Sequence, residues 1–332
     1  MSRFGPFPDP AGLLEHAEAA EAFATMLDGG ASDEQVTEFL IALSERGETM
    51  VEIAAAAQAM RDRLIPIDAP AGAIDVCGTG GDGHHTLNVS TAVSIVVAAC
   101  EVPVAKHGNR AASSKSGAAD TLEALGLDME RADRQAEEQL ADLGICFLFA
   151  GTRHPAMKRI MPIRRAIGRR TIFNLMGPLA NPARVTRQLV GIARPAYVAV
   201  YAEALHRLGT EHSRVISGDE GLDELSLAGG NEVAVVTPEG VRMQRSIAAD
   251  AGLPTRSLAE IRGGDAEYNA KALRRLLEGE LGAYRDAVLY NAAEALVVAG
   301  AAETLLEGVE EAAEAIDKGL ANALLNCWIA YK

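Results

Sequence analysis

Glycines and hydroxyl residues gather directly after the first strand-like run of the sequence. The run AIDVC, residues 73–77, is followed by GTGGDG, Gly78 to Gly83, and then by the apolar run that begins with NVSTA at Asn88. Four glycines in six positions let backbone N–H groups converge on an anion, and Ser90 or Thr91 at the head of a helix would add a cap and the positive end of the helix dipole. The segment predicts a phosphate cradle. Its spacing matches neither G-x-G-x-x-G nor G-x-x-x-x-G-K-[ST], so a plain tight turn is the alternative.

The next strand-like run ends in a segment rich in cations and hydroxyls. The run VPVAKH, residues 102–107, leads into AKHGNRAASSKSG, Ala105 to Gly117, ahead of another helical pattern. This composition suits a multiply charged phosphate group, and a solvated turn is the alternative. A single histidine in such a segment is more often a structural hydrogen-bonding residue than a base. The polar members are Lys106, His107, Asn109, Arg110, Ser113, Ser114 and Lys115.

Two pairs of adjacent carboxylates follow a later strand-like run, HSRVISG. They lie in the sequence Asp219-Glu220-Gly221-Leu222-Asp223-Glu224. An acidic loop on its own is usually solvated surface. Beside two candidate phosphate segments it favours Mg²⁺, which is typically held by one or two carboxylates together with phosphate and water.

The segment from Gly151 to Arg187 contains nine cations and no Asp or Glu. A guanidinium in this segment could bind a carboxylate bidentately. The alternative is a basic helix face paired with the acidic remainder of the chain, which would account for most of the nine. They are Arg153, Lys158, Arg159, Arg164, Arg165, Arg169, Arg170, Arg184 and Arg187.

Alternating strand and helix patterns must hold these segments at one edge of a sheet. Residues 1–70 show helical periodicity alone, with Gly29 and Gly30 ending the first helix and Ser32 with Gln35 forming a capping box for the second. From Ala73 short apolar strands alternate with helices, which predicts an α/β domain with a mostly parallel sheet. A hairpin is expected near Asn231, and residues 269–332 return to helix. Ligands of open α/β sheets bind outside the carboxyl ends of the strands, where the candidate segments lie.

Composition excludes several classes of partner. The 332 residues carry 31 Lys and Arg against 46 Asp and Glu, a formal net charge of -15. Such an acidic chain is a poor candidate for binding nucleic acid or an anionic membrane, because both draw on a cationic surface. The apolar run Val89 to Ala105 is interrupted by polar residues and is too short for a membrane span, so we expect a core helix followed by a strand.

The N-terminal sequence and the cysteines indicate the cellular compartment of the protein. The N-terminus MSRFGPFPDPAGLLEH has no basic stretch followed by an apolar one, so no secretory signal is expected. The four cysteines, Cys77, Cys100, Cys146 and Cys327, show no C-x-x-C spacing and stand among apolar residues. Together these features predict buried, reduced thiols in a cytoplasmic protein.

Taken together and in this order, the segments resemble the anthranilate phosphoribosyltransferase family, which belongs to the class that also holds the pyrimidine nucleoside phosphorylases. The resemblance covers nearly the whole chain, through the helical start, GTGGDG, NVSTA, VAKHGNRAASSKSGAADTLEALG, HPAMK, RRTIFNLMGPLANPA and GLDELS. It implies a mainly helical domain at residues 1–70, taking part in dimerisation and substrate entry. An α/β catalytic domain would follow at residues 71–332, with some of its helices returning to the small domain.

The resemblance also implies a reaction. The 5-phosphoribosyl group of 5-phosphoribosyl 1-pyrophosphate would be transferred to the amine of anthranilate, giving N-(5-phosphoribosyl)anthranilate and pyrophosphate in tryptophan biosynthesis. Displacement would pass through an oxocarbenium-like transition state with inversion at ribose C1. No residue is expected to act as a strong base, because an aryl amine is already neutral at pH 7. The protein would position the amine and neutralise charge on the leaving pyrophosphate.

Site residues follow from the resemblance position by position. Ser90 with Glu224 would bind one Mg²⁺, and Asp223 with Glu224 a second. The residues implied for anthranilate are Gly78, His107, Asn109, His154, Arg164 and Pro178. Those implied for phosphoribosyl pyrophosphate are Gly78, Thr79, Gly81, Asp82, Thr86, Asn88, Val89, Ser90, Thr91, Lys106, His107, Gly108, Asn109, Arg110, Ala111, Ala112, Ser113, Ser114 and Ala118.

Six residues, at four places in the chain, depart from the family pattern. Ala118 stands where a serine commonly contacts the donor, Leu87 replaces a common phenylalanine, and Gly151-Thr152-Arg153 replaces the usual approach to His154. Glu101 occupies a position that is usually glycine. If that position needs a positive φ, about 1 kcal/mol of strain is expected.

Two rival functions share parts of this pattern. A pyrimidine nucleoside phosphorylase needs no site with two metal-binding carboxylates, so Asp223-Glu224 and the string KHGN argue against it. A non-catalytic relative could bind nucleic acid through residues 151–187, and steeply salt-dependent binding without turnover would favour it.

Overall fold

The N-terminal part of the molecule is a bundle of short helices. The computed structural model describes residues 4–111 and 115–332, and its first helices are α1 (His16–Asp28), α2 (Asp33–Arg46) and α3 (Met50–Arg61). The capping box at Ser32 and Gln35 is confirmed, since each side chain accepts the other residue's backbone N–H, at 3.3 and 3.0 Å. Gly29 ends α1 in the left-handed conformation with φ 82, as its position in the sequence predicted.

The central sheet is built from the strands that the sequence predicted. In the described residues seven strands form one sheet of order β3-β2-β1-β4-β5-β6-β7. The first five strands in the chain run parallel, while β6 and β7 form the antiparallel hairpin expected near Asn231. The strands are β1 (Ile74–Gly78), β2 (Val104–Gly108), β3 (Ile145–Phe149), β4 (Arg187–Gly191), β5 (His212–Gly218), β6 (Asn231–Thr237) and β7 (Gly240–Ser246).

The order of the strands determines where a ligand site can form. The chain proceeds from β1 outward to β2 and β3, and then returns to add β4 on the other side of β1. Connections that leave two neighbouring strands in opposite directions open a crevice between their carboxyl ends. In this sheet the crevice lies between Gly78, at the end of β1, and Gly191, which pairs with it at the end of β4.

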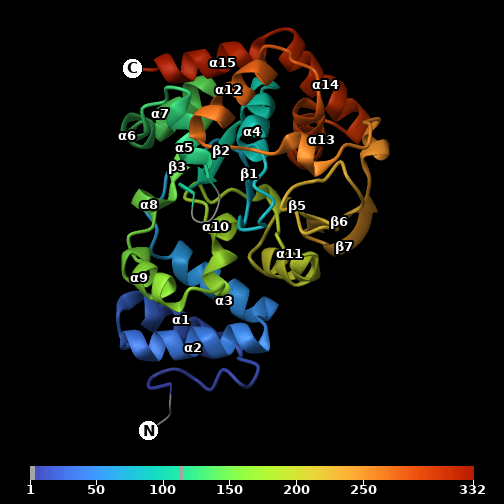
Figure 1. Cartoon of the computed structure of the whole chain (residues 1–332). Coiled ribbons are helices and arrows are strands. Elements are labelled where there is room, and N and C mark those ends of the chain that lie inside the picture. The colour runs from blue at the N-terminus through green and yellow to red at the C-terminus, as the bar shows by residue number, and fades with distance from the viewer. Residues whose placement is uncertain (1–3, 112–114) are drawn as a thin grey trace.

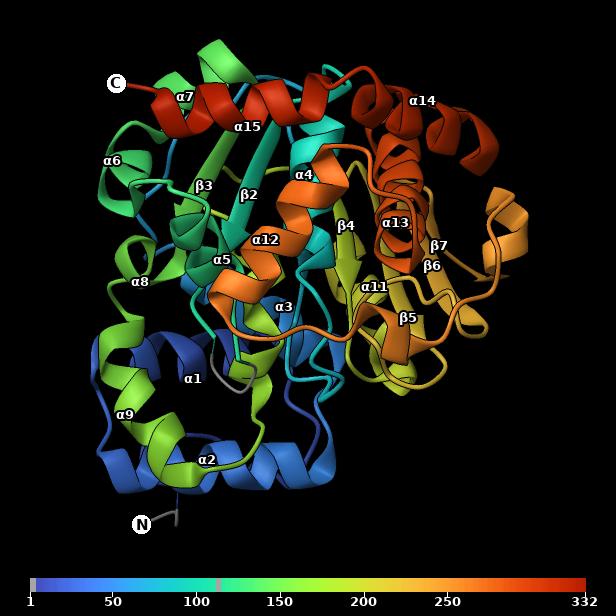
Figure 2. The same ribbon diagram turned by 45° about the horizontal axis from the view of Figure 1, so that its top comes forward.

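Helices cover both faces of the sheet. On one face α4 (Val89–Ala99) and α13 (Ala283–Ala299) pack on the strands, and α12, α14 and α15 form an outer layer (Figures 1 and 2). On the other face α10 and α11 lie between the sheet and α1–α3. The remaining helices are α5 (Ala118–Ala124), α6 (Met129–Arg134), α7 (Ala136–Leu143), α8 (Ala150–Arg153), α9 (Met157–Ile167), α10 (Met176–Leu179), α11 (Val198–Arg207), α12 (Ala266–Leu277), α14 (Leu305–Asp317) and α15 (Leu320–Ala330).

One later helix joins the N-terminal bundle. Figure 1 shows α9 beside α1 and α2, at the end of the molecule opposite α14 and α15. The apolar core on this side combines Phe23 and Phe39 of the bundle with Ile160 and Ile163 of α9. The amphipathic face of α9 therefore binds a chain segment far away in sequence, which brings the basic region 151–187 next to the bundle.

The cysteines correct one expectation. All four thiols are free, and Cys77 and Cys146 are buried, but Cys100 is only partly buried and Cys327 is exposed. Helix α15 turns Ala321, Leu325 and Trp328 toward the core, so position 327 of an amphipathic helix falls on the outer side. The expectation of four buried thiols is therefore wrong for Cys100 and Cys327.

Two further expectations concern the segment around α4. The run Val89 to Ala105 forms α4 and the start of β2, as the sequence predicted. Glu101, in the turn between them, adopts φ 63, so the glycine-like backbone conformation is present with a side chain attached. Within the described residues no helix combines the length and the apolar character that crossing a membrane requires.

Candidate active site

The carboxylate of Asp223 lies in the crevice between β1 and β4. Its Oδ2 accepts the backbone N–H of Gly80 at 2.6 Å, which joins the acidic loop to GTGGDG. Glycine is needed on both strands for this approach. A Cβ at Gly78 would lie 2.3 Å from Asp223 Oδ2, and one at Gly191 only 1.6 Å from the Asp223 carbonyl oxygen. The two strand ends therefore lack side chains where the acidic loop crosses them.

Negative charge accumulates at this point. Burial and the neighbouring Asp82 carboxylate raise the pKa of Asp223 to about 7. Burial and the charge of Asp223 raise the pKa of Glu224 well above its ordinary value. Glu224 Oε1 accepts the N–H of Ser90 at 3.2 Å, while Oε2 is buried and has no hydrogen-bond partner among the described residues. Such a cluster is stabilised by a cation.

The other two carboxylates of the acidic loop are engaged elsewhere. Asp219 forms an ion pair with Arg245 at 2.6 Å, and Glu220 accepts the hydroxyl of Ser226. Within the described residues no group of three or more His, Cys, Asp or Glu side chains could hold a metal by itself. A pair of carboxylates with an adjacent hydroxyl, Ser90, is nevertheless the kind of donor set that Mg²⁺ uses when phosphate and water complete its shell. The residues present therefore fit this ion.

Lys106 is a buried cation near these carboxylates. Its side chain is buried, and its Nζ donates to the Val76 carbonyl at 2.7 Å and to Ser90 Oγ at 3.4 Å. Burial lowers the pKa of Lys106, while the charges of Asp75 and Glu224 oppose that shift. The ammonium is thus held between the end of β1 and the head of α4.

Asp75 is a site residue that the sequence motifs did not reveal. It is fully buried on β1, where Oδ1 accepts the His107 N–H at 3.1 Å and Oδ2 accepts the Asn181 side-chain amide at 2.8 Å. Burial raises the pKa of Asp75, and the charge of Lys106 counteracts it. The signal was an acidic residue inside the apolar run AIDVC, which indicates a buried carboxylate with partners.

The head of α4 differs from expectation. We expected Ser90 or Thr91 to cap this helix, but the N-cap is Asn88 and its side chain makes no capping bond. Ser90 cannot cap because it lies in the first turn, where Glu224 takes its N–H. The Oγ1 of Thr91 is buried without a partner. The expected cap is therefore wrong, while the helix start still lies beside the carboxylates.

Hydrogen bonds from other segments of the chain hold residues 84–88 in place. Gly263 N donates to His85 O at 2.8 Å, and Thr86 forms an isolated bridge with Arg262. Asn88 is held by Thr121 at 2.5 Å and Asn269 at 2.8 Å, both on its Oδ1. Thr79, on the other side of the loop, accepts the Ala193 N–H at 3.2 Å. Val89 is buried as the first residue of α4.

The ends of the second candidate loop are joined by Asp120. Its Oδ2 accepts the N–H groups of Ala111 and Gly117, both at 2.9 Å, and its Oδ1 accepts Arg110 at 3.0 Å. Arg110 also pairs with Glu123 at 2.7 Å. The guanidinium predicted to meet phosphate is therefore already neutralised in this structure. Ala112, Ser113 and Ser114 lie outside the described residues.

Asn109 and Ala118 flank that loop. The side-chain oxygen of Asn109 accepts the Arg110 N–H at 2.8 Å, and its carbonyl accepts the Ala119 N–H at 3.3 Å. A Cβ at Gly108, the last residue of β2, would lie 3.3 Å from the Ala118 methyl. The first turn of α5 thus packs directly on the end of β2, and Ala118 offers only backbone groups to a ligand.

His107, on β2, and His154, which follows α8, lie next to each other. His107 Nδ1 is 2.9 Å from the Gly177 carbonyl oxygen, and the Nε2 atoms of His107 and His154 are 3.1 Å apart. Pro178 follows in the same turn, where its carbonyl accepts the Gln188 amide at 2.7 Å. These three residues of the sequence prediction are therefore neighbours.

Arg164 on α9 is one of the cations of segment 151–187 for which the described residues show no ion pair. In the described residues four of the nine cations, Arg153, Arg159, Arg169 and Arg187, form ion pairs with acidic side chains, so the alternative of a paired basic face holds for these four. In the described part of the chain the half-buried guanidinium of Arg164 has only a 3.7 Å contact with the Met161 sulfur. Burial lowers the pKa of Arg164, because no carboxylate compensates its charge.

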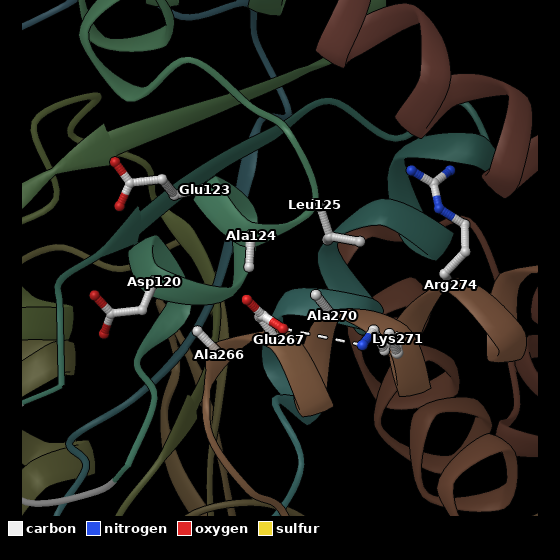
Figure 3. A pocket seen from close by; sticks show the side chains of 9 residues that line it. All are labelled: Asp120, Glu123, Ala124, Leu125, Ala266, Glu267, Ala270, Lys271 and Arg274. Carbon is white, nitrogen blue, oxygen red and sulfur yellow. Dashed lines mark ion pairs between the residues drawn. The ribbon is translucent and has the colours of Figure 1, made fainter.

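A hollow elsewhere on the surface does not coincide with this site. A pocket of about 660 Å³ lies between α5 and α12. Figure 3 shows its lining side chains, with the Glu267–Lys271 ion pair on one side. It has charged residues of both signs on its wall and none of the residues predicted to bind substrate. Asp120 and Glu123, which also line it, are already paired with Arg110.

Comparison with known proteins first gives the class. Residues 71–322 match the model described as glycosyl transferase family, a/b domain, and residues 12–64 match the helical bundle domain of the same family. The chain is therefore a member of a glycosyltransferase family, with the helical bundle domain preceding the a/b domain.

Individual relatives give the particular family. Anthranilate phosphoribosyltransferase of Sphingopyxis alaskensis is 91% identical over the full length of both chains. That of Novosphingobium aromaticivorans is 73% identical, over 97% of this chain and 98% of its own. The chain belongs to the anthranilate phosphoribosyltransferase family, and the resemblance seen in the sequence is confirmed.

Solved structures agree in fold. The anthranilate phosphoribosyltransferase of Thermus thermophilus superposes with a TM-score of 0.89 at 42% identity, covering 96% of each chain. The Saccharomyces cerevisiae enzyme in complex with PRPP and Mg superposes with a TM-score of 0.86 at 28% identity, covering 96% of this chain and 93% of its own. The helical bundle with a mostly parallel α/β sheet is the fold of this family.

Proposed function

We propose that the protein transfers the 5-phosphoribosyl group of phosphoribosyl pyrophosphate to the amine of anthranilate, in tryptophan biosynthesis. The observation that carries the proposal is the contact between Asp223 and Gly80 at 2.6 Å, which places paired carboxylates and a glycine-rich loop in the crevice between β1 and β4. A nucleoside phosphorylase has no need of such a pair. The 91% identity to a named relative supports the same reaction.

The donor occupies the edge formed by residues 78–91 and 106–118 in this proposal. Backbone N–H groups of the glycine-rich loop and the start of α4 bind its phosphates, and the unpartnered Thr91 hydroxyl is suited to the same task. Lys106 supplies buried positive charge on the pyrophosphate side. Arg110, already paired with Asp120 and Glu123, holds the loop rather than the ligand.

Two Mg²⁺ ions are proposed, one held by Ser90 and Glu224 and the other by Asp223 and Glu224. Support comes from the buried, unpartnered Oε2 of Glu224 and from the PRPP and Mg complex of the yeast relative. When bound, the metal supplies positive charge that neutralises the leaving pyrophosphate. The chain's own carboxylates orient it by their fixed positions on the loop after β5.

Anthranilate is proposed to lie between α9 and the end of β2. The free guanidinium of Arg164 binds its carboxylate, since this half-buried cation lacks an acidic partner in the described residues. Asn109 contacts the acceptor, while His107, His154 and Pro178 form the wall along which it enters. The approach of the neutral amine to ribose C1 needs orientation rather than proton removal, so no residue is assigned a catalytic acid or base role.

The assembly is proposed to be a cytoplasmic homodimer formed through the helical N-terminal part. The proposed division is a helical domain at residues 1–70 and an α/β domain at residues 71–332, with α9 returning to the bundle. The exposed side chains of Leu13, 76% accessible, and Met50 support an apolar contact surface on this part of the molecule.

A fluorescence assay tests the reaction. Anthranilate emission should fall only when phosphoribosyl pyrophosphate and Mg²⁺ are both present, and the product should have the mass of N-(5-phosphoribosyl)anthranilate. Phosphorolysis of a pyrimidine nucleoside without anthranilate turnover would contradict the proposal. Steeply salt-dependent binding of DNA or RNA without turnover would contradict it as well.

A further inference from the structure

Arg170, which lies outside the sheet, binds the glycine-rich loop Gly78 to Gly83. It follows α9 and precedes the short 3₁₀ helix Ile172–Asn174. Its Nη2 donates to two successive backbone carbonyls, that of Gly80 at 2.7 Å and that of Gly81 at 2.8 Å. No carboxylate forms an ion pair with Arg170 among the residues the structure describes, so these carbonyls are its main partners.

The two bonds determine which way the loop's N–H groups point. In a trans peptide the carbonyl of one residue and the N–H of the next point in opposite directions. With the carbonyls of Gly80 and Gly81 bound to the guanidinium, the N–H groups of Gly81 and Asp82 point away from it. Neither N–H has a hydrogen-bond partner within the described part of the chain, so both are available to an anion.

Gly81 allows the guanidinium to come this close. Its φ is +74, and a Cβ built on it would lie 2.4 Å from Arg170 Nη2. The glycine therefore serves the carbonyl contact as well as the turn. A side chain at this position would displace the guanidinium and release the two peptide groups that it fixes.

Arg170 is in turn anchored to the helical bundle. Its own carbonyl accepts the hydroxyl of Ser44, on α2, at 3.0 Å, and the adjacent Arg169 pairs with Glu45 of the same helix at 3.0 Å. A continuous set of contacts thus runs from α2 through Arg170 to the loop that follows β1. The position of the bundle and the conformation of the loop are physically connected.

We propose that Arg170 is a positioning residue, which aims the N–H groups of Gly81 and Asp82 at the donor phosphates by holding the carbonyls of Gly80 and Gly81, and which couples that loop to α2 through Ser44. The inference rests on the proposed role of residues 78–83 in donor binding. The role proposed for Arg170 differs from that of Arg164, for which a direct contact with the acceptor is proposed.

Arg170→Met tests this role, with Arg207→Met, at the end of α11, as the control. The KM for phosphoribosyl pyrophosphate should rise about tenfold or more, because two aimed hydrogen-bond donors are lost. The KM for anthranilate at saturating donor should stay within about twofold. Arg207→Met removes an exposed arginine charge away from α2 and the glycine-rich loop, and should change neither KM by more than about twofold.

A crystal structure of ligand-free Arg170→Met distinguishes positioning from direct contact. Reoriented peptide groups at residues 80–82 are expected, since no other group in the described residues binds those two carbonyls. An unchanged loop together with a raised donor KM would overturn the proposal, because the guanidinium would then be acting on the donor itself. An unchanged KM would overturn it too.

A second variant covers the case in which Arg170→Met fails to fold. Ser44→Ala removes only the bond to the Arg170 carbonyl, and it should raise the donor KM by about two- to threefold while leaving the melting temperature nearly unchanged. A donor KM equal to that of the wild type would contradict the coupling to α2. Absence of donor-dependent turnover in the wild type would refute the proposed function instead, and the loop structure would still report on Arg170.

Discussion

His107 and His154 share one proton position between their Nε2 atoms, which lie 3.1 Å apart. His107 Nδ1 must donate to the Gly177 carbonyl at 2.9 Å, because a carbonyl can only accept. Neutral His107 therefore accepts through Nε2, and His154 donates to it from its own Nε2. Burial lowers the pKa of His107 to about 3 and that of His154 to about 4, so both imidazoles are neutral at physiological pH.

Acid should destabilise the protein through this pair. A histidine whose folded-state pKa lies below the unfolded value of about 6.5 binds fewer protons when folded, so its contribution is complete above pH 6.5 and is lost as the pH falls toward 4. At pH 5 each imidazole is expected to cost about 2 kcal/mol. Urea unfolding of His154→Asn between pH 7 and 5 should show a shallower decline than the wild type.

The exposed His16 provides the control for that measurement, because His16→Asn removes a histidine that is not buried. Its unfolding free energy should follow the wild-type pH dependence. Equal slopes for all three proteins would contradict the neutral assignment of the pair.

Glu224→Gln should separate activity from stability. The amide keeps an oxygen for the Ser90 N–H but loses the charge that a divalent cation needs, so kcat at limiting Mg²⁺ should fall by about 10² or more. In EDTA the melting temperature of Glu224→Gln should equal or exceed that of the wild type, because the substitution relieves the repulsion between Glu224 and Asp223. The stabilisation by added Mg²⁺ should disappear. Glu220→Gln, in the same loop but bound to Ser226, should behave as the wild type, and wild-type turnover of Glu224→Gln would refute the metal role.

Asp75→Asn should destabilise the fold. The substitution removes one of the buried negative charges that act on the Lys106 ammonium. It also points an amide donor at one of two donors, the His107 N–H or the Asn181 amide. A loss of about 3 kcal/mol in unfolding free energy is expected. The exposed Asp68→Asn serves as the control.

A double-mutant cycle isolates the Asp75–Lys106 interaction in that variant. Asp75→Asn combined with Lys106→Met should cost less than the two single losses added together, because neither buried charge is left unpaired. Strict additivity would show that the two charges do not interact.

Glu101→Gly should stabilise the protein. Glu101 adopts φ 63 in the turn between α4 and β2, so a glycine removes about 1 kcal/mol of backbone strain. Turnover should not change, because the turn lies at the opposite end of the strands from the site. The control is Glu278→Gly after α12, where φ is -85 and glycine should cost about 0.5 to 1 kcal/mol. Equal effects of the two glycines on the unfolding free energy would rule out strain at Glu101.

Local pattern was enough to predict much of this fold. The capping box of Ser32 and Gln35, the strand runs such as AIDVC and the hairpin near Asn231 depend on neighbours in the chain, so periodicity and turn chemistry reveal them. Asp223 and Glu224 could be selected because two phosphate-like segments precede them. Their approach to Gly78 and Gly191 followed only from the order of the strands.

Contacts between distant segments could not be predicted in this way. Ser90 was expected to cap α4, but its N–H is taken by Glu224, 134 residues away. Arg110 was expected to bind the donor, and Arg170 was one of nine cations of the basic segment 151–187. Arg110 is instead paired with Asp120, while Arg170 holds two carbonyls of a loop 90 residues earlier. Which partner a charged side chain finds depends on the tertiary packing, and a single sequence carries little signal for it.

The most direct test of the account is a crystal structure with phosphoribosyl pyrophosphate, Mg²⁺ and anthranilate bound. We expect the donor phosphates at residues 78–91, metal at Asp223 and Glu224, and the anthranilate carboxylate within hydrogen-bond distance of the Arg164 guanidinium. Donor density away from the crevice between β1 and β4, or an acceptor carboxylate that does not meet Arg164, would contradict it.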